Sequence, residues 1–261
     1  MKMIINKQEI INDLKKLGLE KGDIVIVHSS LKSMGYVCGG AQTVIEALIE
    51  IVGKEGTIVM PSQSWKNLDP ETGAHWEVNQ EDWDYIRENW PVYDRDLTPT
   101  NTMGAIAEMF RKWPDSIRTT HPARSFCALG NKAQYITYKH DLSDIFGEES
   151  PLGRLYELNA KVLLIGVGYD KNTSLHLADV RAEYPGKHNC IEHSAVLENG
   201  KRVWKAYETL YVDGEDFVEI GNSFEKEYKV SISGIGDATC RLMNQRELVD
   251  FAVRWIEENR K

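Results

Sequence analysis

The chain has 261 residues, of which 42% are hydrophobic and 27% charged, and this ordinary globular mixture excludes a collagenous or low-complexity protein. Its formal net charge of -9 argues against non-specific nucleic-acid binding, which depends on contacts of Lys and Arg with phosphates. No apolar run approaches the roughly 20 residues that cross a bilayer, and residues 1–10 lack the apolar stretch of a signal peptide. The four cysteines are widely spaced and form no CxxC pair, which is typical of a reduced chain. We therefore expect a cytoplasmic protein that binds neither nucleic acid nor a membrane.

The first sixty residues predict alternating helices and strands. Asn6 opens a capping-box sequence, and the helix that it begins ends at Gly18. A buried strand is expected at 23–28, a second helix after the glycine pair 39–40, and another strand at 57–60. This succession indicates a sheet that is covered by helices.

Residues 66–100 break this pattern. Between positions 69 and 96 there are nine acidic and two basic residues, so this stretch carries -7 of the net charge. A long segment without regular structure is usually functional or disordered, and its aromatic residues argue against disorder. These aromatic residues are Trp76, Trp83, Tyr85, Trp90 and Tyr93. The segment is expected to be either a lid over a site or a surface insertion that its aromatics anchor.

Regular structure is predicted again after residue 100. Strand and helix patterns alternate, and the Asn199–Gly200 pair between two β-rich runs indicates an antiparallel hairpin. Parallel units together with a hairpin imply a mixed sheet. The predicted helices are 102–112, 151–158, 173–182 and one that begins after Asn244, and the predicted strands are 125–129 and 161–167.

The strongest local signal for chemistry is the stretch from Gly166 to His176. A buried strand ends there, a polar turn follows, and a helix begins at the Asn172 cap. This arrangement places His176 in a first helical turn near the carboxyl end of a strand, where open α/β sheets bind ligands. A helix N-terminus favours neutral imidazole, which can accept a proton, and Asp170 is a candidate to orient the ring. The alternative is that Asp170 supports the turn while His176 packs on the sheet.

Three further segments have weaker signals. Ser29–Ser30 follow a strand and precede the glycine pair of a helix, and such a place can bind an anion. Residues 98–104 crowd hydroxyl groups at a helix start, and residues 118–126 include Arg118 and Arg124, which could face phosphates. Each segment alone reads as an ordinary loop.

Several enzyme signatures are absent. The sequence contains neither GxxxxGK[ST] nor GxSxG, so a P-loop nucleotide hydrolase and a nucleophile-elbow hydrolase are disfavoured. The run from His188 to His193 matches no common zinc spacing, and we expect no metal.

In combination and in this order, these segments closely resemble the aminoglycoside 3-N-acetyltransferase family, in particular its chromosomal bacillus-type branch. The matching stretches are VHSSLKSMGYVCGGAQTVIEAL, TPTNTMGAIAE, THPARSFCALG, GEESPLGRL, VLLIGVGYDKNTSLHLAD and EDFVEIG. The resemblance implies acetyl-CoA as the donor and an α/β fold, a single-domain α/β/α sandwich with a mixed central sheet over residues 1–261. This fold differs from that of the GNAT acetyltransferases, and the chain has no convincing [QR]xxGx[GA] loop.

The resemblance also implies roles for particular residues. His176 would be the catalytic base, supported by Asp170 and by Asp179, where many relatives carry a Glu. The coenzyme A site would be formed by Ser29, Ser30, Leu31, Met103, Gly104, His121, Ser125, Phe126 and Thr173. The amine acceptor would be bound by Asp69, Asp82 and Asp84 in the acidic insertion and by Asp213, Asp216 and Glu219 near the C-terminus.

The expected reaction is acetyl transfer from acetyl-CoA to a primary amine, with the 3-amino group of a 2-deoxystreptamine aminoglycoside as the leading acceptor. A neutral histidine removes the proton that keeps the amine from attacking. Direct transfer is expected, and Cys38 beside the glycine pair is the alternative covalent nucleophile. Two other readings stay open: an acetyltransferase for a different amine, and a non-catalytic protein that binds coenzyme A or a polycation. The oligomeric state also stays open, with a homodimer as one option.

Overall fold

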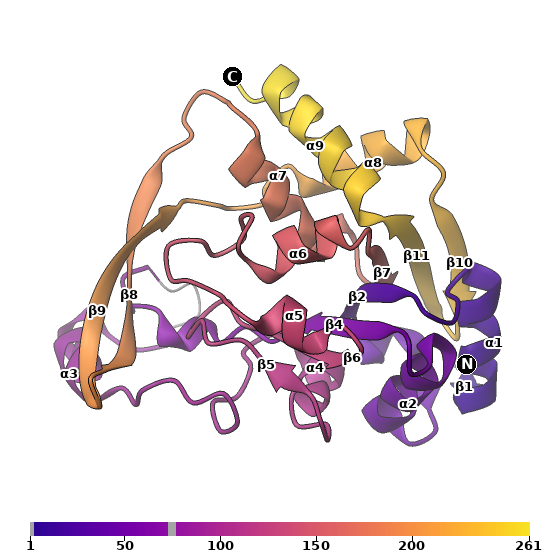
Figure 1. Ribbon diagram of the computed structural model, residues 1–261, viewed down its shortest axis with the longest axis horizontal. Helices are drawn as coiled ribbons and strands as arrows, with labels where there is room; N and C mark the ends of the chain where they lie inside the picture. The colour runs from indigo at the N-terminus through magenta and orange to yellow at the C-terminus, as the bar shows by residue number, and fades with distance from the viewer. Residues whose placement is uncertain (1–2, 73–76) are drawn as a thin grey trace.

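The computed structural model describes residues 3–72 and 77–261, and its centre is a seven-stranded mixed sheet (Figure 1). The strands β7, β2 and β4 run parallel at the middle, and the flanking strands pair antiparallel with them or with one another. In spatial order the sheet consists of β10 (Ser231–Ile235), β11 (Ala238–Asn244), β7 (Lys161–Ile165), β2 (Ile24–Ser29), β4 (Thr57–Pro61), β6 (Phe126–Gly130) and β5 (Ile117–Arg118). The predicted mixed sheet is confirmed.

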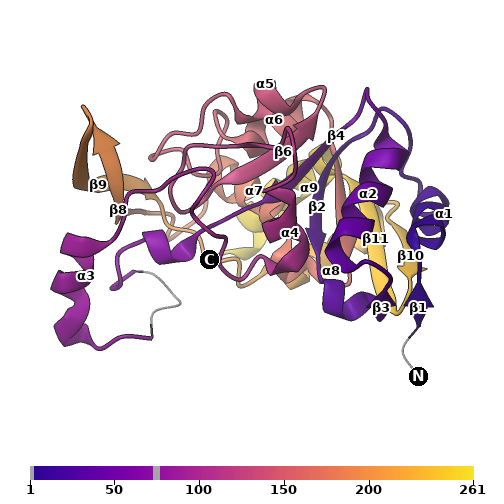
Figure 2. The same ribbon diagram turned by 90° about the horizontal axis from the view of Figure 1, so that it is seen from below.

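Helices cover both faces of this sheet (Figures 1 and 2). On one face lie α1 (Lys7–Leu17), α2 (Gly40–Val52) and α4 (Gly104–Phe110), which pack on Val25 and Val27 of β2. On the other face lie α5 (Ala133–Thr137), α6 (Pro151–Glu157), α7 (His176–Arg181), α8 (Phe217–Glu227) and α9 (Gln245–Asn259). The alternate residue Ile26 faces this second core, as the two-residue period of a strand requires. The predicted α/β/α sandwich is therefore confirmed.

The caps of the first and last helices follow from their sequences. The Asn6 Oδ1 atom accepts the backbone N–H of Glu9 at 3.1 Å, and the Glu9 carboxylate accepts the backbone N–H of Asn6 at 2.8 Å. Gly18 ends the helix with a φ of 104°, a conformation that favours glycine. At α9 the Asn244 side chain accepts the Glu247 backbone N–H at 3.0 Å. Both caps were predicted from their spacing.

A long hairpin stands apart from the central sheet (Figure 1). It consists of β8 (Asn189–Glu198) and β9 (Lys201–Leu210), joined by Asn199 and Gly200 with φ values of 51° and 75°. These positive values are those of the tight turn that the Asn-Gly pair predicted. Beside the hairpin lies α3 (Trp83–Asn89), so the segment 66–100 contains a helix that its sequence did not predict.

Short elements complete the described structure. The strands β1 (Ile4–Ile5) and β3 (Tyr36–Val37) form a small parallel ribbon. The short 3-10 helices are η1 (Leu31–Met34), η2 (Trp65–Asn67), η3 (Gln80–Asp82), η4 (Tyr169–Lys171) and η5 (Thr173–Leu175). Within the described ranges no helix combines the length and the apolar character that a bilayer crossing requires.

Candidate active site

Two cavities open where the central parallel strands end. The first has a volume of about 880 Å³ and is lined by residues that follow β2 and β7. The second has a volume of about 760 Å³ and extends from there toward the β8–β9 hairpin. Five residues line both cavities, and they are Thr102, Met103, Asp170, Lys171 and Thr173. The cavities therefore meet at the carboxyl edge of the sheet, where α/β folds place their ligands.

The first cavity contains six of the nine residues predicted for coenzyme A. These are Ser29, Ser30, Leu31, Met103, Gly104 and Thr173. The amino terminus of α2, at Gly40, also lines it, and Lys32 and Lys171 contribute ammonium groups. A helix N-terminus and two lysines in one cavity suit an anionic ligand.

The other three predicted residues lie behind the cavities. His121 and Ser125 are fully buried, as is the Phe126 ring. The Nδ1 atom of His121 accepts the backbone N–H groups of Ala123 and Arg124 at 3.2 and 3.1 Å. Burial lowers the pKa of His121 well below its ordinary value, so the ring is neutral. These three residues do not line the two described cavities, and their contact with coenzyme A stays a prediction.

His176 lines the second cavity from the start of α7. Its Nδ1 atom lies 2.8 Å from Oδ2 of Asp179, one helical turn further along the chain. The ring stacks on Phe146 at a centroid distance of 4.7 Å and an interplanar angle of 8°, and Phe217 contacts it at 4.7 Å. The carboxylate selects the tautomer with the proton on Nδ1, which leaves Nε2 free to accept a proton.

Asp170 does not take the role that its position in the turn suggested. Its Oδ2 atom lies 3.0 Å from the Lys171 ammonium group, and its side chain is half exposed at the junction of the two cavities. Asp179, whose side chain is 2% exposed, is the carboxylate that contacts the imidazole. The spacing of a helix explains this result, because residues i and i+3 share one face.

Arg124 forms part of the wall of the second cavity. Its guanidinium stacks over Trp65 at 4.1 Å and pairs with the Glu192 carboxylate of β8. The side chains of both charged partners are less than a tenth exposed. Arg124 therefore lines the cavity with its charge paired to Glu192, and its contact with a phosphate stays a prediction.

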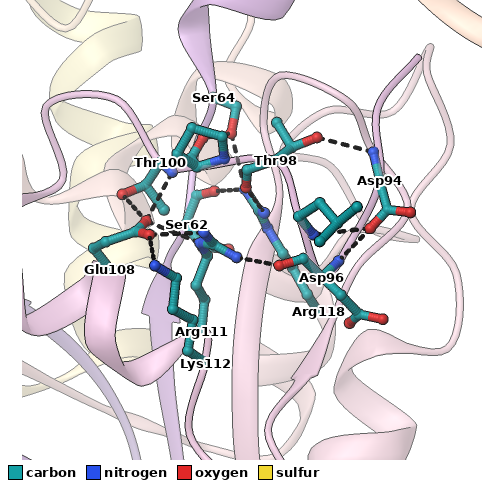
Figure 3. A network of polar contacts seen from close by, with 12 residues as sticks. Ser62, Ser64, Asp94, Asp96, Thr98, Thr100, Glu108, Arg111, Lys112 and Arg118 are labelled. Carbon is teal, nitrogen blue, oxygen red and sulfur yellow. Dashed lines mark hydrogen bonds and ion pairs between the residues drawn. The ribbon is translucent and has the colours of Figure 1, made fainter. Parts of the chain in front are cut away.

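Arg118 is buried too, and it holds the loop that precedes α4 (Figure 3). Its guanidinium donates to the carbonyl oxygens of Thr98 at 2.5 Å and Ser62 at 2.6 Å, and to Oγ of Ser64 at 2.8 Å. These contacts are internal, and a contact of Arg118 with a phosphate also stays a prediction.

A second set of contacts fixes the same loop to α4 (Figure 3). Glu108 accepts both the backbone N–H and the hydroxyl group of Thr100 at 2.9 Å, and Arg111 pairs with Glu108 while donating to the Asp96 carbonyl at 2.6 Å. Burial alone would raise the pKa of Glu108, but hydrogen bonds from Arg111 and Thr100 outweigh it and lower the pKa to about 2. The loop thus leads in a fixed path to Thr102 and Met103 at the junction of the cavities.

The predicted acceptor residues are scattered. Asp213 lines the second cavity. Asp216 is held by the Arg260 guanidinium at 2.7 and 2.8 Å, and Glu219 lies on the exposed side of α8. Neither Asp216 nor Glu219 lines the second cavity as the structure describes it.

The acidic insertion contributes no carboxylate to the second cavity within the described residues. Asp69 is buried in a bidentate pair with Arg87 at 2.8 and 2.9 Å, and Asp84 pairs with the same guanidinium at 2.8 Å. Asp82 is exposed. None of these three residues lines the cavity, so their contact with the acceptor stays a prediction, whereas Leu68 and Thr72 of the insertion do line it.

The aromatics of the insertion serve mainly as anchors. The Trp90 indole donates to Oδ1 of Asn67 at 2.8 Å, and the Tyr93 hydroxyl donates to the Thr119 carbonyl at 2.9 Å. Trp76, which was also singled out, lies outside the described residues. The aromatic ring that reaches the second cavity from this side is Trp65, just before the insertion.

Sequence reasoning missed most of the hairpin side of the second cavity. Cys190, Glu192, Leu210 and Tyr211 lie on or next to β8 and β9, far along the chain from Trp65 and His176. The one available sequence signal was an acid, Glu192, within a predicted strand. Only the structure shows that this carboxylate is buried and paired with Arg124. Residues 188–193 contribute to no cluster of three or more metal-ligating side chains in the described parts of the chain.

Fold and site together define an α/β enzyme in which two cavities meet beside a histidine–carboxylate pair. The chain matches the family model of aminoglycoside 3-N-acetyltransferase over residues 26–257. The chain belongs to this family, so it is an acetyltransferase by class and the predicted resemblance is confirmed.

Individual relatives agree along almost the whole chain. The SPbeta prophage-derived aminoglycoside N(3')-acetyltransferase-like protein YokD of Bacillus subtilis (strain 168) is 46% identical over 255 residues, which is 97% of this chain and 93% of YokD. The crystal structure of YokD superposes with a TM-score of 0.94 at 45% identity, covering 98% of this chain and 95% of that one.

Two other solved structures contain ligands. The structure of AAC-VIa bound to sisomicin has a TM-score of 0.89 at 29% identity and covers 99% of both chains. The binary structure of AAC-IIIb with CoASH has a TM-score of 0.86 at 28% identity and covers 98% of this chain and 97% of that one.

Proposed function

We propose that this protein transfers the acetyl group of acetyl-CoA to a primary amine, most specifically the 3-amino group of a 2-deoxystreptamine aminoglycoside. The observation that carries the proposal is the His176–Asp179 pair in a cavity that shares five lining residues with a second, larger one. The larger cavity, from here the donor cavity, would hold acetyl-CoA. The cavity that His176 lines, from here the acceptor cavity, would hold the amine. Relatives solved with CoASH and with sisomicin support the choice of these two kinds of ligand.

In the proposed reaction the acceptor ammonium first releases one proton to solvent, and Nε2 of His176 takes a second proton from the neutral amine as it attacks. The amine nitrogen attacks the thioester carbonyl carbon, a C–N bond forms, and the carbonyl electrons move to oxygen. The C–S bond then breaks, the electrons return, and the coenzyme leaves as a thiolate that takes the proton from the imidazolium. General-base assistance of this kind contributes on the order of 10²- to 10⁴-fold.

The donor cavity suits a long molecule with an anionic end. Lys32 and the amino terminus of α2 would attract the phosphates, and the apolar side chains of Leu31 and Met103 would pack along the pantetheine arm. Gly104, with a φ of 84° and no side chain of its own, allows the chain to turn closely at this point.

The acceptor cavity suits a cationic amine. Two of its carboxylates are paired internally, Glu192 with Arg124 and Asp170 with Lys171. Asp213 accepts the backbone N–H of Glu215 at 3.0 Å and its side chain is exposed, so it is the carboxylate best placed to receive an ammonium group. Trp65 offers an aromatic surface in the same cavity.

Direct transfer is favoured over an acetylated cysteine. Cys38 is exposed and is not among the residues that line the described cavities. Cys190 lines the acceptor cavity, but burial, and after it the Glu192 carboxylate, raises the pKa of its thiol. A raised pKa reduces the thiolate that a nucleophile requires.

The test is thiol release from acetyl-CoA with a panel of amines that includes sisomicin, a simple diamine and a monoamine. We expect turnover with sisomicin and an N-acetylated product whose position is read by nuclear magnetic resonance. Turnover of a different amine alone would assign another acceptor to the same chemistry. Coenzyme A binding without turnover of any amine would show that the protein binds the coenzyme but does not catalyse transfer.

Direct transfer predicts sequential kinetics. Double-reciprocal plots at several acceptor concentrations should intersect, and a Cys38→Ala variant should retain wild-type kcat. Parallel lines, together with an acetyl group trapped on the protein, would show that a covalent intermediate forms.

A further inference from the structure

Arg260, which follows the last helix, reaches the back of the catalytic carboxylate. Its Nη1 atom lies 2.7 Å from Oδ1 of Asp179, while Oδ2 of the same carboxylate lies 2.8 Å from Nδ1 of His176. One oxygen of Asp179 therefore faces a guanidinium and the other faces the imidazole. Sequence reasoning did not single out this arginine.

The position of Arg260 is itself fixed. Its Nε and Nη2 atoms donate to the two oxygens of Asp216 at 2.7 and 2.8 Å, and its guanidinium stacks over the Tyr184 ring at 4.7 Å. Bidentate pairing of this kind holds a guanidinium in one plane. A chain of contacts thus runs from Asp216 through Arg260 and Asp179 to His176.

We propose that Arg260 is a positioning residue for the transfer reaction, which it serves by fixing and charge-balancing the Asp179 carboxylate that orients His176. The inference rests on the proposed function, in which His176 is the base. Asp179 is 2% exposed in its side chain, and a buried carboxylate needs a charged partner to remain in place. Within the described residues, Arg260 is the one guanidinium or ammonium group at ion-pair distance from Asp179.

The charge of Arg260 also acts on the imidazole. A guanidinium behind the carboxylate opposes imidazolium formation, and its removal would leave the negative charge of Asp179 to favour the protonated ring. The acid limb of the activity profile should therefore lie at higher pH in a variant that lacks this charge.

Other groups surround this pair and are constant between the variants below. The charged and titratable residues that line the same cavity as His176 are Asp170, Lys171, Arg124, Cys190, Glu192 and Asp213. Around Asp179 are Tyr184, His188, Tyr211, Glu215, Asp216 and Lys261.

The test compares Arg260→Gln and Arg260→Lys with Arg254→Gln. Arg254 lies on α9 and donates to the Tyr228 hydroxyl at 3.0 Å, so its variant is a matched loss of one guanidinium from the same region. For Arg260→Gln we expect an acid limb of the kcat profile about one pH unit higher, about a 10-fold lower kcat at pH 7 and an acetyl-CoA KM within about two-fold of wild type. Arg260→Lys keeps the charge, so its acid limb should lie at the wild-type pH. Its kcat should stay below that of wild type. Arg254→Gln should match wild type.

Two results would overturn the inference. One is a wild-type profile for Arg260→Gln. The other is equal losses of kcat, acetyl-CoA affinity and melting temperature without movement of the limb, which would make Arg260 a structural residue only. Either result leaves the proposed function standing as long as His176→Ala is inactive. An active His176→Ala enzyme would instead remove the base on which both proposals depend.

Discussion

At the scale of single residues, the imidazole of His176 is held on three sides. Phe146 and Phe217 fix the plane of the ring, and Asp179 fixes which nitrogen carries the proton. Asp179 and Asp170 therefore have different contacts, although both are carboxylates close to His176 in the sequence.

Replacing Asp179 and Asp170 by asparagine should therefore affect the reaction rate to different extents. In Asp179→Asn the new amide can turn its NH2 group toward Nδ1 of His176 and so select the tautomer that cannot accept a proton at Nε2. We expect Asp179→Asn to lower kcat at least about 100-fold, as loss of a tautomer-selecting carboxylate does elsewhere. Asp170→Asn should stay within a few-fold of wild type. Initial rates at saturating substrates check this, and an equal loss in both variants would contradict the assignment.

Single residues also show how far the site can be predicted from the sequence. His176, the glycine-rich turn before it and the Ser29–Leu31 stretch could be predicted, because a strand end followed by a helix cap has a local signature. The burial of His121, Ser125 and Phe126 could not be predicted, because a motif next to a strand does not reveal whether its side chains face a cavity or the interior. Arg260 has no local signal, since its partner Asp179 lies 81 positions away in the chain, as the two residue numbers show.

At the scale of elements, the predicted helices and strands follow from caps, periodicity and glycine. The central strands are apolar runs bounded by turns, and the structure confirms them within a few residues. Short strands such as β1 and β5 have two residues each and no period to read, so they could not be predicted. The helix α3 has only seven residues and none of them is buried, so no apolar stripe marked it in the sequence.

Two buried cations, Arg111 and Arg118, hold the loop at 94–100, and Arg118 contacts two of its carbonyl groups. Replacing Arg118 with methionine keeps much of its volume but leaves the Thr98 carbonyl without its donor, while the Ser62 carbonyl keeps only the Ser125 hydroxyl. A buried unsatisfied group costs about 1–3 kcal/mol, so we expect Arg118→Met to lower the free energy of unfolding by about 2 kcal/mol. Urea denaturation measures this. The control Arg95→Met, at an exposed position in the same loop, should change stability little, and equal effects would show that Arg118 is not the anchor.

At the scale of the whole molecule, three buried histidines link stability to pH. Burial lowers the pKa of His28 to about 3 and of His140 to about 4, and it also lowers that of His121. In the unfolded chain these groups bind protons near pH 6.5, so below this pH the unfolded state holds more protons than the native state. The free energy of unfolding should therefore fall as the pH drops from 6.5 toward 4.

The expected loss is up to about 2 kcal/mol per histidine between pH 6.5 and 5. Urea unfolding at these two pH values gives the total. In His140→Gln the dependence should be weaker by one histidine, because the glutamine does not titrate. Unchanged stability between pH 6.5 and 5 would show that these rings are not kept neutral by the fold.

The distribution of charge over the molecule should affect how strongly a cationic acceptor is attracted to its cavity. The acidic insertion lies beside the hairpin that lines the acceptor cavity, far from α1 and α2 (Figure 1). Asp82 and Asp84 do not line that cavity, so any effect on a polycation is long-range attraction, which salt screens within about 8 Å at physiological ionic strength. We expect kcat/KM for a polycationic amine to fall with salt more steeply than for a monoamine.

A double variant, Asp82→Asn with Asp84→Asn, should flatten this salt dependence and leave acetyl-CoA affinity unchanged. Its control is Glu20→Gln with Glu55→Gln, two exposed acids in the loops that follow α1 and α2. Similar behaviour of the two double variants would mean that net charge alone, and not the insertion, attracts the acceptor.

The claim on which the rest depends is that His176 removes the proton from the acceptor amine. The most direct measurement pairs kcat of His176→Ala with its acetyl-CoA dissociation constant, because the imidazole lines the acceptor cavity and not the donor cavity. We expect transfer to fall by at least about 100-fold while the dissociation constant stays within a few-fold of wild type. A variant that retains a tenth or more of the wild-type kcat would contradict the assignment of His176 as the base.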